Sequence, residues 1–76
     1  MRKMHCRLAV LMAEKNPTLS LAEVARSSNI SYPAVYRLFT NDFKRVDTET
    51  IEKLCDYFRC NLADLFELRD ITNADG

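Results

Sequence analysis

The fold is decided by residues 20–40, which read SLAEVARSSNISYPAVYRLFT. Ser20 and Glu23 read as a capping box, which predicts the start of a helix because two such side chains can satisfy free amide groups at its N-terminus. Ser31 is a second N-cap candidate, and Pro33 suits the first turn that follows, where an amide proton has no intrahelical partner. The stretch therefore predicts two short helices separated by very few residues.

The residues between and within these helices predict a steep crossing. Ala25 is small enough for two helices to approach closely, and Asn29, four residues later, tolerates the positive φ that a very tight turn requires. Apolar residues then follow the turn and recur on the inner side of the second helix, namely Ile30, Val35 and Leu38. Together they make the pattern of a helix-turn-helix.

Helices are also expected on both sides of this motif. Met4, Leu8, Leu11 and Met12 share one helical face, which predicts a first helix ending near Lys15. Asp47 and Asn61 are expected to cap a fourth and a fifth helix. The other side chains expected to face inward are Leu21, Val24, Phe39, Ile51, Leu54, Cys55, Phe58, Leu62, Leu65 and Phe66. One glycine and two prolines leave little of the punctuation that hairpins need, so we expect an all-α, five-helix fold.

The 76 residues allow one domain, which we place at residues 1–68, with a polar C-terminal tail at residues 69–76. The longest apolar run is too short for a membrane span or a signal peptide. Cys6, Cys55 and Cys60 are an odd set without framework spacing, which predicts reduced thiols. We therefore expect a cytoplasmic protein with no membrane partner.

The charges are divided along the chain, although the formal net charge is zero. Residues 1–45 hold eight lysines and arginines against three acidic residues, and residues 46–76 hold three against eight, so the two parts carry +5 and −5. A basic part of this kind can engage phosphate while the acidic part faces away.

With these residues, the stretch from Leu21 to Thr40 resembles the Cro/C1-type (XRE family) helix-turn-helix transcriptional regulators, and the likeness extends over roughly residues 4–68. The segment from Ile51 to Leu65 looks like the fourth and fifth helices of that family. The resemblance implies a lambda-repressor-like DNA-binding domain, with the motif at about residues 21–40. This chain departs from the family in a longer linker before the motif, in Leu21 where glutamine is frequent, and in Arg59 where glycine is frequent.

The resemblance also implies that the helix at residues 32–39 lies in the major groove of DNA. The base-reading candidates are Tyr32, Pro33, Tyr36, Arg37 and Thr40. Arg37 can bond guanine O6 and N7 bidentately, and its alternatives are a phosphate contact or a solvated surface position. Tyr36 can pack on a thymine methyl group, bond a phosphate, or lie half-buried in the core, whereas Tyr32 and Pro33 can contact a thymine methyl or only shape the turn.

The phosphate-binding candidates are Ser20, Ser31, Asn41, Lys44 and Arg45. The two serines lie at helix N-termini, where amide protons and the helix dipole favour an anion, and plain capping is compatible with that role. The other three follow the recognition helix in a loop that borders DNA in the family.

We therefore predict a sequence-specific DNA-binding regulator of bacterial or phage type that binds double-stranded operator DNA as a homodimer. The fourth and fifth helices, with Phe43, Tyr57, Phe66 or Leu68, are the expected dimer surface. The alternative is a protein-interaction module, antitoxin-like or anti-repressor, built on the same fold. No catalytic residues, cofactor or metal are expected, because no nucleophile–base pair or glycine-rich phosphate loop is present, and His5 with Cys6 lacks a second ligand pair.

Overall fold

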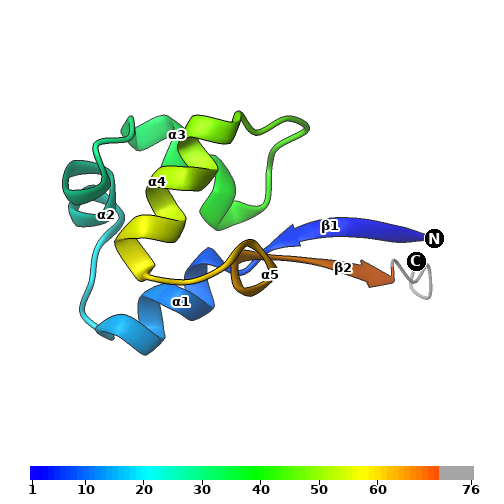
Figure 1. Ribbon diagram of the computed structural model, residues 1–76, viewed down its shortest axis with the longest axis horizontal. Coiled ribbons are helices and arrows are strands. Elements are labelled where there is room, and N and C mark those ends of the chain that lie inside the picture. Colours follow the sequence, from blue (N-terminus) through cyan, green and yellow to red (C-terminus); the bar gives the residue numbers. More distant parts are fainter. Residues whose placement is uncertain (71–76) are drawn as a thin grey trace.

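The computed structural model describes residues 1–70 of the chain. Its elements are β1 (Arg2–Cys6), α1 (Leu8–Lys15), α2 (Leu21–Ser28), α3 (Tyr32–Thr40), α4 (Thr48–Phe58), α5 (Leu62–Leu65) and β2 (Phe66–Asp70) (Figure 1). The five helices expected from the sequence are confirmed. The two strands were not expected, so the all-α class is only approximate.

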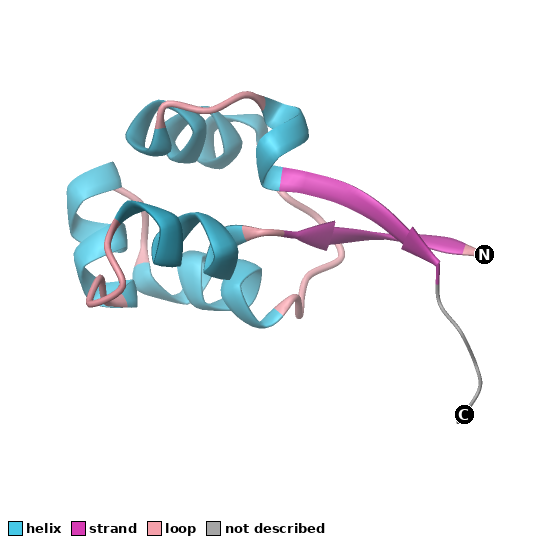
Figure 2. Ribbon diagram, turned by 90° about the horizontal axis from the view of Figure 1, so that it is seen from below, coloured by secondary structure: helices cyan, strands magenta, loops and turns pink. Residues whose placement is uncertain are grey.

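The helices gather into one body, and the two strands extend from it as a ribbon (Figure 2). The body encloses a single apolar core, because each helix buries one face against the others. Its buried members are Cys6, Leu8, Leu11, Met12, Val24, Ala25, Val35, Leu38, Leu54, Leu65 and Phe66.

Three inward positions were predicted wrongly, since Met4 is 43% exposed, Phe39 is 37% exposed and Leu62 is 56% exposed. Met4 lies in a strand and not in the first helix. Phe39 lies in the last turn of α3, and Leu62 opens a helix of four residues, too short to turn both of its leucines to the core.

The ribbon is an antiparallel pair in which Met4 lies opposite Leu68 and Cys6 opposite Phe66. The backbone amide of Arg7 donates to the carbonyl of Leu65 at 2.7 Å, which extends the pairing to the helical body. Helix α1 therefore begins at Leu8, not near Met4 as expected, although it ends at Lys15 as predicted. The spacing of Met4 and Leu8 fits a helix, but strand pairing with a distant segment overrides it.

The ribbon also changes the C-terminal boundary. Arg69 and Asp70 belong to β2, so the ordered domain extends two residues into the segment expected to be a polar tail. Residues 71–76, the rest of that segment, lie outside the described residues.

Three helices end in a residue with left-handed backbone, and none of the three is glycine. Asn29, Asn41 and Arg59 have φ of 62°, 61° and 54°. At α2, α3 and α4 respectively, the amides of these residues donate back to carbonyls of the last helical turn. This termination lets each following segment reverse direction within one or two residues.

Candidate nucleic-acid interface

The turn between α2 and α3 has the geometry that the sequence predicts. Asn29 adopts φ 62° and ψ 46°, and the amide of Ile30 donates to the carbonyl of Ala25 at 2.9 Å. Ala25 is 7% exposed, because its methyl group lies within the core cluster. Asn29 therefore supplies the positive φ and Ala25 the small side chain that a helix-turn-helix needs.

Helix α3 is fixed by its inner face, because Val35 and Leu38 are 0% and 2% exposed. Its opposite face carries all five base-reading candidates, and each of them is exposed: Tyr32, Pro33, Tyr36, Arg37 and Thr40. The structure thus brings these five side chains together on one surface of one helix, as their helical spacing requires.

The exposed face of α3 combines flat aromatic surface with one cation. The rings of Tyr32 and Tyr36 stack with centroids 6.3 Å apart and planes 19° apart, and both tyrosines are about half exposed. Thr40 bonds back to its own helix, with Oγ1 donating to the carbonyl of Tyr36 at 3.1 Å. Within residues 1–70 the guanidinium of Arg37 has no hydrogen-bond or ion-pair partner, so its donors are available to a ligand.

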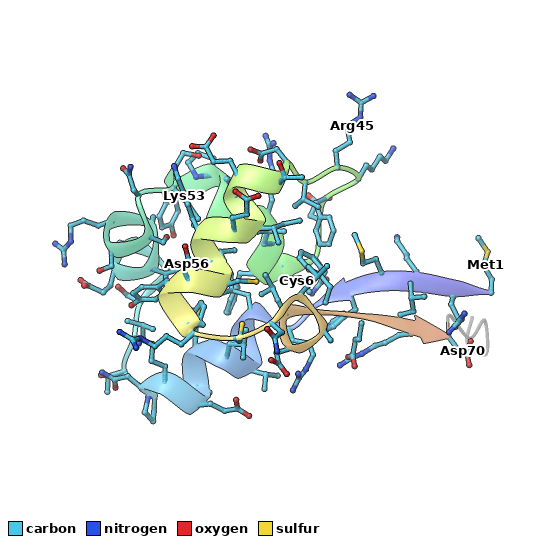
Figure 3. All side chains as sticks on the ribbon, in the orientation of Figure 1. Met1, Cys6, Arg45, Lys53, Asp56 and Asp70 are labelled. Atoms are coloured by element: carbon cyan, nitrogen blue, oxygen red, sulfur yellow. The ribbon has the colours of Figure 1, made fainter. Side chains whose placement is uncertain are left out.

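The basic loop between α3 and α4 lies beside this face. Arg45 lines the same hollow as Arg37, together with Phe43 and the start of α4, so the structure brings the two guanidinium-bearing segments together. The side chain of Arg45 extends away from the helical body (Figure 3). Lys44 is exposed next to it, so both cations of this loop are accessible to a phosphate backbone.

The two serine candidates lie at helix N-termini and are exposed. The Ser20 hydroxyl accepts a hydrogen bond from the amide of Glu23 at 3.1 Å, which confirms its capping position. Ser31 precedes α3 with extended backbone, but among the described residues its side chain makes no capping bond. Its hydroxyl and the first amides of α3 are therefore open to an anion.

Asn41 differs from the other candidates because its side-chain amide is already engaged. Its Oδ1 accepts from the amide of Cys6 at 2.7 Å, and its Nδ2 donates to the carbonyl of Cys6 at 3.2 Å. Asn41 is also the left-handed residue that ends α3. It therefore joins the end of α3 to the base of β1.

Sequence reasoning missed Lys53, which holds the turn of the motif from outside. Its Nζ donates to the carbonyl of Asn29 at 3.1 Å and lies 3.0 Å from the carboxylate of Glu49. The four-residue spacing of Glu49 and Lys53 could have indicated this ion pair, but not the contact with the turn.

Four ionisable groups of the described residues have shifted pKa values, and one of them is the Cys60 thiol, whose pKa is raised to about 11 by burial. The Thr50 hydroxyl, 2.6 Å from the Asp47 carboxylate, lowers the pKa of Asp47. The side chain of Arg69 lowers the pKa of Glu67, and burial raises the pKa of the Cys6 thiol to about 11. None of these groups lies on the exposed face of α3.

No group of three or more His, Cys, Asp or Glu side chains within residues 1–70 could hold a metal ion. In the same part of the chain, no helix combines the length and the apolar character that crossing a membrane requires.

An exposed, polar and aromatic face on the second helix of a helix-turn-helix, flanked by basic side chains, defines a DNA-binding domain. The comparison with known families agrees, because the Cro/C1-type HTH DNA-binding domain matches the chain over residues 7–70. The chain belongs to this family. No curated protein and no solved structure matches it significantly.

Proposed function

We propose that this chain is a sequence-specific transcriptional regulator of bacterial or phage type that reads operator DNA with the outer face of α3. The observation that carries the proposal is the division of α3 into two faces. Val35 and Leu38 fix the helix in the core, and the five candidates on the opposite face are exposed together. A major groove about 12 Å wide admits one such helix.

In this proposal Arg37 reads a guanine through its unpaired guanidinium, because the planar fork matches O6 and N7. Tyr32 and Tyr36 supply a stacked aromatic surface near the leading end of the helix, which suits thymine methyl groups. Pro33 shapes that leading end, and Thr40 lies one turn after Tyr36 on the same exposed face.

Phosphates are bound at two places in this proposal. Ser20 and Ser31 present helix N-termini, and Lys44 and Arg45 present cations on the far side of α3. Contacts on both sides would fix the register of the helix in the groove. The side-chain amide of Asn41 is already hydrogen-bonded to Cys6. We therefore propose that Asn41 positions α3 and does not contact a phosphate.

We further propose that the protein acts as a homodimer on a two-fold site. One helix-turn-helix reaches only a few base pairs, and a second copy doubles the sequence that is read.

A fluorescence-anisotropy titration with DNA from the region upstream of the protein's own gene tests the reading of DNA. Arg37→Ala should weaken specific binding by about 1 to 3 kcal/mol, roughly 5- to 150-fold. Arg59→Gly is the matched control, because it removes an exposed arginine at the end of α4 and should leave affinity unchanged.

Salt dependence distinguishes DNA binding from the protein-interaction alternative. Each neutralised phosphate contributes about −0.9 to the slope of log K against log salt, so the affinity should fall steeply as salt rises. Equal affinities of Arg37→Ala and the unaltered chain would refute readout by α3. Absence of binding to this DNA and to a randomised pool at low salt would favour a protein partner.

A further inference from the structure

The ribbon of β1 and β2 carries an exposed apolar face beyond the core. Cys6 and Phe66, at its base, are buried, whereas Met4 and Leu68, the next pair on the same face, are 43% and 54% exposed. Figure 3 shows Cys6 beside the helical body and Met1 with Asp70 at the far end of the ribbon. The ribbon therefore continues the apolar face of the core into solvent.

The aromatic side chains expected at a dimer surface are engaged within the chain instead. Phe43 packs edge-on against Phe66 with centroids 6.1 Å apart, and Tyr57 packs against Phe58 with centroids 4.9 Å apart. Leu68 is the one member of that expected set that remains exposed.

The outer edge of β2 is open for strand pairing. The bond from the Arg7 amide to the Leu65 carbonyl fixes which groups face inward, because hydrogen-bonded pairs alternate along an antiparallel ladder. Glu67 and Arg69 consequently bond to β1, and the amides and carbonyls of Leu68 and Asp70 face outward. No other element within residues 1–70 pairs with this edge.

We propose that a second copy of this chain pairs with the outer edge of β2, antiparallel and centred on Leu68, to form a four-stranded sheet. This inference deepens the dimer proposed above by naming its surface. The amide and carbonyl of Leu68 bond those of Leu68 in the second copy, and the amide of Asp70 bonds the carbonyl of Phe66 in the second copy. Met4, Leu68 and their two counterparts then form one apolar row across the sheet.

Charge decides the register of this pairing. Centring on Leu68 sets Glu67 opposite Arg69 of the second copy, and by symmetry this pair occurs twice. Within one chain these two side chains already lie on one face, with Nε 2.5 Å from Oε2. Centring one residue earlier or later sets Glu67 opposite its own counterpart, or Arg69 opposite its own, and like charges directly opposite are unfavourable.

The outer edge of β1 is less suited than that of β2 to pairing with a second copy, for two reasons. Its outward groups at Cys6 are occupied by the side chain of Asn41. An antiparallel pairing centred on Met4 would also set the Lys3 side chains of the two copies diagonally next to each other on one face, which brings like charges together.

The geometry suits a two-fold operator. The two-fold axis of the proposed dimer is perpendicular to the four-stranded sheet. The two α3 helices therefore lie on the same side of the sheet, and the two helical bodies lie at opposite ends of the joined ribbons. Two five-residue strands form a small interface, so we expect the dissociation constant of the dimer to be roughly micromolar.

Sedimentation equilibrium without DNA tests the pairing, so that its failure and a failure of DNA reading give different results. The unaltered chain should reach twice the chain mass at high concentration. Glu67→Arg and Arg69→Glu should each weaken the dimer about tenfold or more, because each places like charges opposite one another twice. Circular dichroism checks that each variant is folded.

Mixing the two variants tests directly whether Glu67 of one copy pairs with Arg69 of the other. The chain with Glu67→Arg then carries two cations where the chain with Arg69→Glu carries two carboxylates, so a mixed dimer should form. Glu14→Arg, a charge reversal at an exposed position of α1 away from the ribbon, is the matched control and should leave the dimer intact. A monomer at all concentrations, a dimer insensitive to both variants, or no association in the mixture would overturn the proposal.

Discussion

Asn41 makes the contact whose removal best tests how the recognition helix is held. Its side chain bonds both the amide and the carbonyl of Cys6, at 2.7 and 3.2 Å, across 35 residues of sequence. Its backbone has a positive φ of 61° at the end of α3. Two substitutions separate these properties. Glycine adopts the positive φ without strain but lacks the side-chain amide, whereas alanine lacks the amide and is also strained at a positive φ.

The magnitudes follow from these contacts. Each lost hydrogen bond costs about 1 kcal/mol, and the contact between Asn41 and Cys6 is only partly buried, so Asn41→Gly should lower the free energy of unfolding by about 2 kcal/mol. Asn41→Ala adds the cost of a left-handed residue with a Cβ atom, roughly 1 to 2 kcal/mol, for a total of about 3 to 4. Such losses are a large fraction of the stability of a 76-residue domain.

Urea unfolding followed by circular dichroism measures both variants, and DNA titration at low temperature measures the affinity of the molecules that stay folded. Asn41→Gly should lose stability, whereas its affinity for DNA should fall less than that of Arg37→Ala. If Asn41→Gly is as stable as the unaltered chain but binds DNA poorly, the amide contacts phosphate and the positioning role is wrong.

Three further changes have defined outcomes. Arg59→Gly removes the strain of an arginine with a positive φ and should raise the thermal midpoint of unfolding. The free energy of unfolding should increase by about 0.5 to 1 kcal/mol, because the entropy that glycine adds to the unfolded chain offsets part of the relieved strain. A lower midpoint would contradict this. Replacing Lys44 and Arg45 together by alanine should reduce the salt slope of DNA binding by nearly 2, about 0.9 for each phosphate contact, and an unchanged slope would remove both from the interface. The Cys6 thiol, with its pKa raised to about 11, should react slowly with a thiol reagent near neutral pH in a chain whose other cysteines are serine. Because the unfolded thiol ionises from about pH 9, it loses its proton before the folded one, and stability should fall between about pH 9 and 11; equal labelling of folded and unfolded chains would contradict the burial.

The motif could be predicted because its determinants are local. The Ser20 cap, the left-handed Asn29 and the small Ala25 each act within a few residues, so sequence spacing is enough to place two helices and their turn. The exposed face of α3 follows from the same spacing, since Val35 and Leu38 fix the inner face and thereby the outer one.

The ribbon could not be predicted, because its determinants are not local. Residues 2–6 form a strand only because residues 66–70 lie beside them, and the spacing of Met4 and Leu8 is compatible with a helix. Asn41 shows the same limit at the site. A polar residue after a recognition helix suggests a phosphate contact, and only the fold shows that its amide meets Cys6.

This contact connects two parts of the molecule that otherwise have separate tasks. The backbone of Asn41 ends α3 on the carbonyls of Arg37 and Leu38, and its side chain holds the base of β1. Two copies can read a two-fold site only if their recognition helices keep a fixed separation. If the ribbons join the copies, that separation is set by how firmly each ribbon is attached to its own α3, and Asn41 is the direct attachment. A positioning residue at this point therefore affects the reading of paired half-sites without touching DNA.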